Sequence, residues 1–215
     1  MRKSGFASFL LLLGLVFVVA ALFWARYNAA LTRRAGEANQ DVLALLYQQI
    51  PKVSSWDEFS LEAAGELSDQ PDYVVNPQMP MPVCEINGVL YIGYLSIPAL
   101  NLELSVASAC DYDTLDISPC RYSGSAYEGN LVLSAHNYGT HFGSIGSLQL
   151  GSPVYFTDMD GNVFKYRVSK QEVLLPTDSE LMVQGEFPLT LFTCTVGGSY
   201  RVTVRCDYMH EEESA

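Results

Sequence analysis

The chain has 215 residues, which is enough for one domain of average size and an N-terminal extension. From residue 35 onward it carries 24 acidic and 7 basic side chains, a formal net charge of −17. A domain this acidic lacks the basic footprint that nucleic-acid binding needs, and an anionic membrane surface would repel it. We therefore expect no nucleic-acid partner.

The first predicted element is an uncharged run of 21 residues, Gly5 to Ala25. It is long enough to cross a bilayer as a helix, it has no polar face, and it exceeds the usual core of a signal peptide. No small-x-small cleavage pattern precedes the polar sequence, so a retained anchor is favoured over a removed signal peptide. The positive-inside rule does not decide the orientation, because basic residues flank both ends: Arg2, Lys3, Arg26, Arg33 and Arg34.

After the N-terminal stub, anchor and basic flank of residues 1–34, we expect a helical stalk and linker over residues 35–82. Residues 26–49 favour a helix that ends before Pro51. The pattern leaves open whether this helix continues the membrane helix or packs on the next domain. Its expected apolar face comprises Ala38, Val42, Leu45, Leu46 and Gln49. The proline-containing stretch that follows predicts a linker with one short helix near residues 56–67.

Residues 83–208 predict a domain of many short strands without long helices, which is typical of an all-β sandwich or barrel. A short helix is expected at residues 111–117, with Asp111 or Asp113 as its cap, and a helical turn within residues 175–182. Residues 209–215 form an acidic tail. The strands expected before the last hairpin are residues 89–97, 102–106, 130–134, 153–157 and 162–171.

A closing hairpin is expected at residues 188–205, where apolar and polar residues alternate on both sides of a tight turn at Gly197 and Gly198. This hairpin places Cys194 at the end of one strand and Arg201 near the start of the next. A nearby cation favours the thiolate form of a cysteine, so the pair is a candidate reactive site. A cysteine that packs as a small apolar side chain fits the same local pattern.

The remaining chemistry-bearing residues are few. His136 follows a predicted strand and opens a glycine-containing loop, where active-site groups are often displayed. His141 lies five residues later, which does not match helical metal-ligand spacing, and no Cys-x-x-Cys pair occurs, so we expect neither a metal nor a cofactor. Cys110 and Cys120 are close enough in sequence to form a disulfide, although unpaired cysteines fit the sequence equally well.

Attack of a thiolate on a carbonyl needs a nucleophile, an acid for the leaving amine and a partner for the oxyanion. Cys194, His136 and Arg201 supply one candidate for each role.

Three segments together resemble the sortases, which are membrane-anchored transpeptidases of mainly Gram-positive bacteria. The first is Thr190-Leu-Phe-Thr-Cys194 followed by Arg201, which resembles the family's cysteine and arginine signature. The second is Tyr91-Ile-Gly-Tyr-Leu-Ser-Ile-Pro98, which is similar to its first barrel strand. The third is Gly129-Asn-Leu-Val-Leu-Ser-Ala-His-Asn137, which is similar to the segment with its catalytic histidine. The chain departs from the family at Ala135, where glycine usually precedes the histidine.

The resemblance implies an eight-stranded β-barrel and a cysteine transpeptidase with its domain outside the cell and its amino terminus inside. Cys194 would cleave a Leu-Pro-x-Thr-Gly-like sorting signal between Thr and Gly through a thioacyl-enzyme. His136 would be the general acid and then the general base, and Arg201 would hold the oxyanion or the substrate. The partners would be surface proteins that bear the signal and an amine on a cell-wall precursor or a pilin. We also expect four residues to contact substrate: Thr193, Ala135, Asn137 and Tyr138.

Some points stay open. Tyr138, His141 and Phe142 fit a substrate groove or simple packing. No Asp-Pro-aromatic lid motif precedes the barrel and no second apolar span occurs at the C-terminus, which argues against a typical pilus-building class C sortase. The helical N-terminal extension and Asn137 after the histidine are compatible with class B, which otherwise stays unassigned. Two other functions use the same residues: a cysteine peptidase with water as the acceptor, and an anchored binding domain in which these residues are structural.

Overall fold

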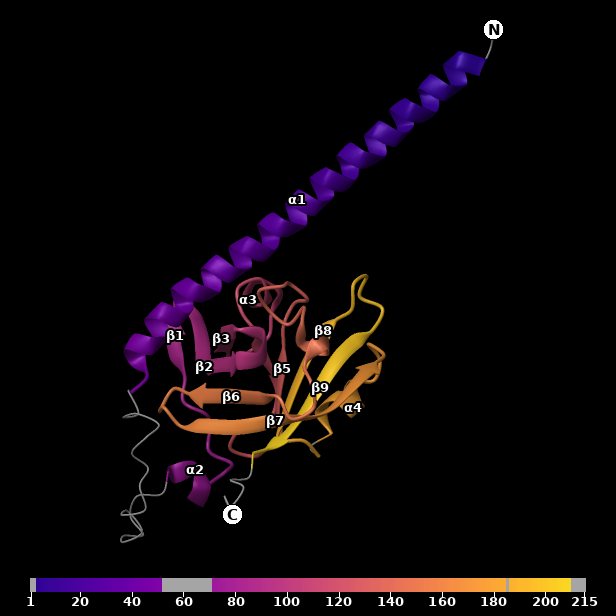
Figure 1. Cartoon of the computed structure of the whole chain (residues 1–215). Coiled ribbons are helices and arrows are strands. Elements are labelled where there is room, and N and C mark those ends of the chain that lie inside the picture. Colours follow the sequence, from indigo (N-terminus) through magenta and orange to yellow (C-terminus); the bar gives the residue numbers. More distant parts are fainter. Residues whose placement is uncertain (1–2, 52–70, 185, 210–215) are drawn as a thin grey trace. The chain divides into compact units, whose positions relative to one another are not determined.

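The computed structural model describes residues 3–51, 71–184 and 186–209 (Figure 1). The chain forms two compact units, residues 1–34 and residues 35–215. The helix expected near residues 56–67 and most of the expected acidic tail lie outside the described residues.

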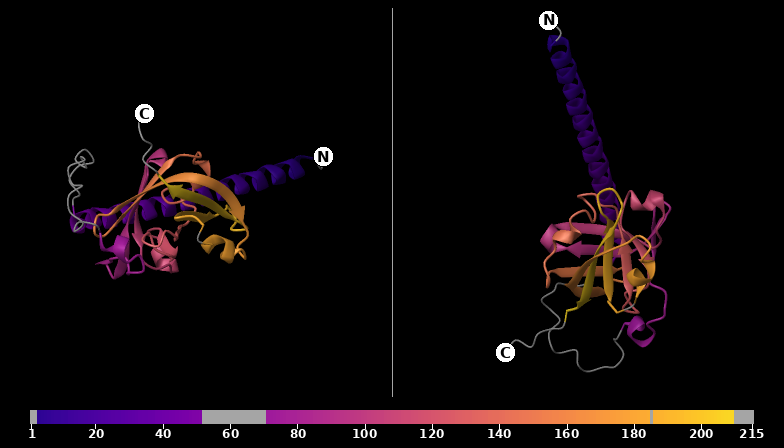
Figure 2. Two further views of the ribbon diagram at one scale, coloured as in Figure 1. Left: turned by 90° about the horizontal axis from the view of Figure 1, so that it is seen from below. Right: turned by 90° about the vertical axis from the view of Figure 1, so that its right-hand side faces the viewer.

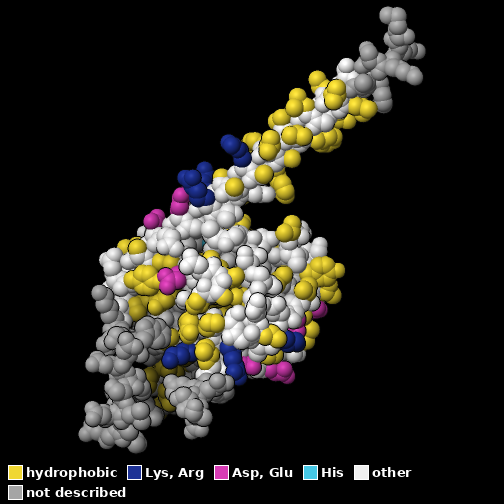
Figure 3. Space-filling model, in the orientation of Figure 1, with side chains coloured by type: hydrophobic (Ala, Val, Ile, Leu, Met, Phe, Trp, Pro, Cys, Tyr) yellow, Lys and Arg dark blue, Asp and Glu magenta, His cyan; other side chains and the backbone are white. Residues whose placement is uncertain are grey.

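One long helix, α1 (Lys3–Gln49), starts in the first unit and continues into the second. From Ser8 it includes a window of 18 residues with a mean hydropathy of 2.6 and no buried residue. Apolar side chains cover the visible face of this part, and basic side chains follow them (Figure 3). By length and composition the helix is able to cross a membrane, which is consistent with an anchor or a signal sequence.

The last four turns of α1 belong to the second unit, and their buried face differs in part from the expected one. Leu45 is 41% exposed and Gln49 is exposed as well. These two residues were expected to face inward because the face was chosen from helical spacing alone. That choice left out a buried polar residue. Asn39 is that residue: its side chain donates to the carbonyl of Glu103 and accepts from the backbone and hydroxyl of Ser105. The face that is buried comprises Ala35, Asn39, Val42, Leu43 and Leu46.

The second unit is a closed barrel of eight antiparallel and parallel strands, which confirms the expected fold class (Figures 1 and 2). The order around the barrel is β2-β3-β4-β5-β8-β9-β7-β6, and β6 pairs with β2 to close it. A further short strand, β1 (Cys84–Ile86), pairs with β2 from outside the ring. The barrel strands are β2 (Val89–Ile97), β3 (Leu102–Ala107), β4 (Cys120–Ser123), β5 (Leu131–Ser134), β6 (Pro153–Asp158), β7 (Val163–Leu174), β8 (Leu189–Cys194) and β9 (Arg201–Tyr208).

Barrel closure depends on a glycine at the junction of three strands. Gly93 lies at a bulge in β2, has a φ of +144°, and pairs with Asp158 of β6. A Cβ atom at this position would collide with the Thr157 carbonyl. Glycine is therefore the residue that lets β2 and β6 approach closely enough to pair.

Short helices connect the strands. The expected helix near residue 111 is present as α3, and its cap is Asp111, whose carboxylate accepts from the backbone N–H of Thr114 at 2.8 Å. The helical turn expected within residues 175–182 is present as α4. The short helices are α2 (Asp72–Val75), η1 (Pro98–Leu100), α3 (Tyr112–Leu115), η2 (Ile145–Ser147) and α4 (Ser179–Val183).

Both faces of β8 are buried, because the barrel interior covers one and α4 covers the other. Leu189 and Leu191 belong to the main core. On the outer face, Phe192 packs with Met182 of α4. Arg205 of β9 is buried beside them and donates to the carbonyls of Leu181 and Met182 and to Glu172. These bonds hold α4 against the strand that ends at Cys194.

The turn of the closing hairpin is longer than expected. Residues 195–200 connect β8 to β9, so Gly197 and Gly198 are part of a six-residue loop rather than the whole turn. Gly198 N donates to Thr195 O at 2.8 Å, and Gly197, with a φ of +85°, occupies the position of that turn that needs a positive φ.

Candidate active site

Cys194 and Arg201 form the last pair of the antiparallel ladder between β8 and β9. Side chains of directly paired residues lie on the same face of a sheet, with Cβ atoms about 4.5–5.5 Å apart. Both residues are half-buried. The hairpin therefore brings the expected nucleophile beside the expected cation at the end of the barrel.

His136 comes to the same end through β5, which runs parallel to β8. Their register ends at Ser134 opposite Phe192. Two further hydrogen bonds extend the alignment, from Ala135 N to Phe192 O at 3.3 Å and from the Thr193 hydroxyl to Ala135 O at 2.8 Å. Because the strands are parallel, continuing this register by two residues puts His136 level with Cys194.

Two neighbours contact the His136 ring on the described chain. Its Nε2 lies 3.3 Å from Oδ1 of Asp116, with side chains that are 31% and 67% exposed. The Tyr138 ring lies 4.9 Å from the His136 ring, and its hydroxyl donates to the same Asp116 oxygen at 3.3 Å. Sequence reasoning missed Asp116, because its position depends on the Cys110–Cys120 disulfide and on the pairing of Cys120 with Ser134 of β5.

The loop after His136 turns back sharply on itself. Phe142 N donates to His136 O at 3.1 Å, and Gly143 N donates to Tyr138 O at 2.9 Å. A Cβ atom on Gly143 would lie 2.6 Å from the carbonyl oxygen of Asn137 and 2.7 Å from that of Tyr138. Close packing of this backbone therefore requires glycine, and it fixes the direction in which His136 leaves β5.

His141 lies inside this loop and is fully buried. Burial lowers the pKa of its imidazole from 6.5 to about 4, and the charge of His136 acts in the same direction. The ring packs on Tyr138 at 5.5 Å. His141 is thus an uncharged packing residue at pH 7. The described residues contain no cluster of three metal-ligating side chains.

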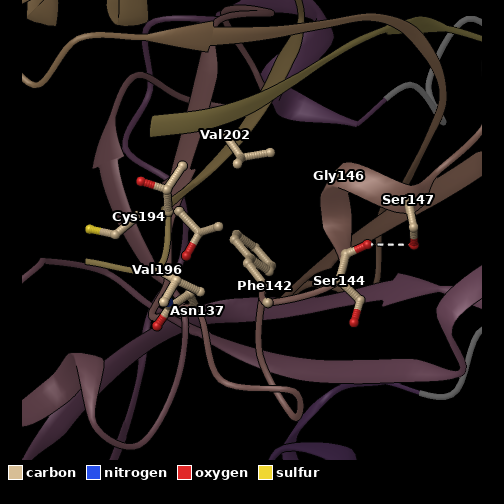
Figure 4. Close-up of a pocket in the computed structure, with 11 residues that line it drawn as sticks. Asn137, Phe142, Ser144, Gly146, Ser147, Cys194, Val196 and Val202 are labelled. Atoms are coloured by element: carbon tan, nitrogen blue, oxygen red, sulfur yellow. Dashed lines mark hydrogen bonds between the residues drawn. The ribbon is translucent and has the colours of Figure 1, made fainter. Parts of the chain in front are cut away.

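A cavity of about 510 Å³ opens beside Cys194 (Figure 4). Cys194, Asn137 and Val196 lie on one side of Phe142, and Ser144 and Ser147 lie on the other. Of the four residues expected to contact substrate, Asn137 and Thr193 line this cavity. The full lining comprises Asn137, Phe142, Gly143, Ser144, Gly146, Ser147, Thr193, Cys194, Thr195, Val196 and Val202.

The other two expected substrate residues have different surroundings. Ala135 is buried and uses its carbonyl to bind Thr193. Tyr138 packs between the rings of His136 and His141. The serines of the lining were not expected. They lie at η2, and the only sequence signal for them is the two Gly-Ser pairs at residues 143–144 and 146–147.

The guanidinium of Arg201 is held by the hairpin loop. Its Nη1 donates to the carbonyls of Gly198 at 3.0 Å and Tyr200 at 3.2 Å. Both bonds use one nitrogen, whereas a guanidinium has five N–H donors on three nitrogens. The loop can therefore orient the group while other N–H groups bind an oxyanion.

The remaining cysteines are in different states. Cys110 and Cys120 are joined in a disulfide that closes the segment containing α3. Cys206 is buried on β9, and burial raises the pKa of its thiol to about 12. Cys84 is a free, half-buried thiol on β1.

Solved structures with the same fold include sortase A from Corynebacterium diphtheriae. It is 22% identical, with a TM-score of 0.51 and coverage of 87% of this chain and 86% of that one. Sortase C of Streptococcus pneumoniae is 24% identical, with a TM-score of 0.50 over 59% of this chain and 71% of that one. A sortase D5 transpeptidase of Clostridium perfringens is 21% identical, with a TM-score of 0.50 over 56% and 79%. At these identities the likeness shows a common fold.

No curated protein matches the sequence. The sequence profile of the sortase domain, however, matches residues 95–209, which is more than half of the chain and includes His136, Cys194 and Arg201. The chain therefore belongs to the sortase family of cysteine transpeptidases.

Proposed function

We propose that this protein is a membrane-anchored transpeptidase that cleaves an LPxTG-like sorting signal between Thr and Gly and transfers the protein to an amine. One observation carries the proposal: Cys194 pairs directly with Arg201 at the end of the β8–β9 ladder, beside the cavity. The parallel register of β5 and β8 supports the assignment of His136 as their partner.

In the first half of the reaction, the sulfur of Cys194 attacks the threonine carbonyl carbon, and the carbonyl oxygen takes the negative charge. Arg201 donates hydrogen bonds to that oxygen. As the bond between the carbon and the glycine nitrogen breaks, His136 gives a proton to the leaving amine. The product of this half is a thioester between Cys194 and threonine.

In the second half, an incoming amine attacks the thioester carbonyl. His136 takes a proton from that amine, a new amide bond forms, and the thiolate of Cys194 leaves. His136 thus ends the cycle protonated, as it began. The acceptor belongs to a cell-wall precursor or to a pilin, and the substrate is a surface protein that bears the sorting signal.

The apolar part of α1 supports a membrane location for this reaction. We infer that it is a single-pass anchor with the amino terminus in the cytoplasm and the barrel outside. Residues 83–208 would then form the catalytic domain and residues 35–82 the connection to the anchor. An anchored enzyme meets a membrane-bound substrate and a lipid-linked acceptor in the same plane, so the anchor raises their effective concentration.

The test uses the full chain in detergent with a sorting-signal peptide, with and without an added amine such as triglycine. The expected main product with amine is the aminolysis product, and it forms faster than free acid does. Cys194→Ala removes both products. Cys84→Ala is the matched control, because it also replaces a half-buried free thiol and should retain activity.

The two other functions predict different results. A cysteine peptidase releases free acid at a rate that the amine does not change. A binding domain yields neither product, and Cys194→Ala in cells leaves attachment of surface proteins intact. Either result would overturn the proposal.

A further inference from the structure

The side chain of Asp116 faces the proposed general acid from a segment that a disulfide closes. Asp116 lies at the end of α3, between Cys110 and Cys120. Its Oδ1 is 3.3 Å from Nε2 of His136. The sequence identifies the cysteines and the helix cap separately, and the structure brings them together at one ring nitrogen.

The segment is tied to the strand that carries His136. Cys120 begins β4, and it pairs with Ser134 at the end of β5, two residues before the histidine. The disulfide joins the other end of the segment, Cys110, to the same point. Asp116 and His136 are therefore both held close to the Cys120–Ser134 pair.

The interior of the segment is ordered by its own hydrogen bonds. Asp111 accepts from the backbone and the hydroxyl of Thr114, both at 2.8 Å. The backbone N–H of Asp116 donates back to the Tyr112 carbonyl at 3.3 Å. The Tyr138 hydroxyl donates to the Asp116 carboxylate from the other side. These bonds limit the freedom of the carboxylate before it meets the imidazole.

This restriction of the Asp116 carboxylate matters because an exposed ion pair usually contributes little to stability. Most of the attraction is lost to solvent screening and to the entropy of holding two mobile side chains together. Here the carboxylate is on a closed loop and His136 is on a tight one, so less entropy is lost when they pair. A modest but well-directed interaction is the result.

We propose that Asp116 is a positioning residue for His136 and that the Cys110–Cys120 disulfide keeps it in place. The Nε2–H group of His136 donates to the Asp116 carboxylate, which holds the ring and leaves Nδ1 as the nitrogen that exchanges protons during transfer. This role rests on the proposed function, because it needs the acid–base steps at His136. It adds a residue and a covalent link that the chemistry of the cysteine, histidine and arginine does not require.

The charged and titratable groups placed near His136 come from four elements, and the ion pair that His136 makes on the described residues is with Asp116. Tyr138 and His141 come from the loop after β5, with His141 neutral. Cys194 and Arg201 come from β8 and β9. Replacing the Asp116 carboxylate therefore removes the anion that contacts the His136 ring at Nε2.

The first test compares Asp116→Asn with Asp113→Asn in the full chain. Asp113 is an exposed carboxylate on the same short helix, so the control removes the same charge from the same segment. Asp116→Asn should lower kcat about 3- to 5-fold with little change in KM. Equal kcat values for the two variants would overturn the role.

The second test concerns the disulfide. Reduction with a phosphine opens the loop without replacing the buried Cys120, and a thermal melt shows that the barrel remains folded. Reduction should lower kcat of the parent by the same factor as Asp116→Asn and should add little in that variant. If reduction slows both proteins equally, the disulfide does not act through Asp116.

A third measurement separates this inference from the proposed function. In a Cys194→Ala background, which performs no chemistry, the ¹⁵N signal of His136 Nε2 should change with Asp116→Asn and stay unchanged with Asp113→Asn. If the parent enzyme gives no aminolysis product, the transferase proposal is refuted. The ¹⁵N signal of His136 Nε2 still tests the contact with Asp116, because it needs no activity. An unchanged signal would overturn the positioning role even in an active enzyme.

Discussion

Cys194 and Arg201 face each other across the last pair of the β8–β9 ladder. The Arg201 guanidinium bonds to the carbonyls of the loop that joins the two strands. Nucleophile and cation are thus placed by one hairpin, and a change in its loop would alter both.

The three free thiols should react at very different rates. Cys194 is half-buried beside a cavity and pairs with Arg201 across the ladder, whereas Cys206 is buried with its thiol pKa raised to about 12. A thiolate-seeking reagent should therefore modify Cys194 first and leave Cys206 unmodified in the folded protein. Peptide mapping after brief alkylation measures the order. Modification of Cys84 ahead of Cys194 would argue against an activated thiol.

Arg201→Lys should not be tolerated as a conservative change. Lysine keeps the charge but lacks the planar fork that bonds the loop with one nitrogen and an oxyanion with others. We expect a loss of kcat/KM of about 100-fold, the usual effect of removing one oxyanion donor. Arg167→Lys, an exposed exchange on β7, should have no effect. Near-normal turnover of the Arg201 variant would remove Arg201 from the oxyanion role.

Asn39 should contribute to stability through its bonds between α1 and β3. Asn39→Ala leaves the Ser105 N–H, the Ser105 hydroxyl and the Glu103 carbonyl without this partner in a buried place. Unsatisfied buried groups of this kind cost about 1–3 kcal/mol. The exposed Gln40→Ala is the control, and denaturant unfolding is the measurement. Equal free energies of unfolding would mean that water replaces the lost bonds at no cost.

His141 should make the barrel sensitive to acid. Its pKa is about 4 in the folded protein and 6.5 when exposed, so the unfolded chain binds the proton more tightly. The free energy of unfolding is therefore unaffected by this group above pH 6.5. It decreases as the pH falls from 6.5 toward 4, by up to about 3 kcal/mol. His141→Phe keeps a ring against Tyr138 and cannot be protonated. Unfolding curves of the two proteins should diverge below pH 6.5, and parallel curves would refute the assignment.

Sequence patterns predicted most of the barrel but not all of it. The strand at residues 89–97 is a mostly apolar run between Gly88 and Pro98, and its bounds match β2. In contrast, β4 has only four residues and is recognised only through its pairing with β5. A membrane helix and a helix over residues 26–49 were both expected, but whether they join was left open. The buried face of the second was partly misjudged, because the buried polar Asn39 is identified only by its partners on β3.

The site shows the same division. The cysteine, histidine and arginine could be selected from residue type, strand ends and a family resemblance. Asp116 could not, because its contact with His136 arises from the packing of a disulfide-closed segment against β5. The turn at Gly197 and Gly198 was expected to be tight, but loop length is set by where the ladder ends, at Cys194 and Arg201.

The central claim is that Cys194 forms a thioester with the threonine of a sorting signal. The most direct measurement is intact-mass spectrometry of the full chain mixed with a sorting-signal peptide without amine, followed by peptide mapping. The account predicts an added mass equal to the peptide up to threonine, located on Cys194, absent in Cys194→Ala, and discharged by triglycine. Absence of this adduct while the peptide is being cleaved, or the same adduct in Cys194→Ala, would contradict the account.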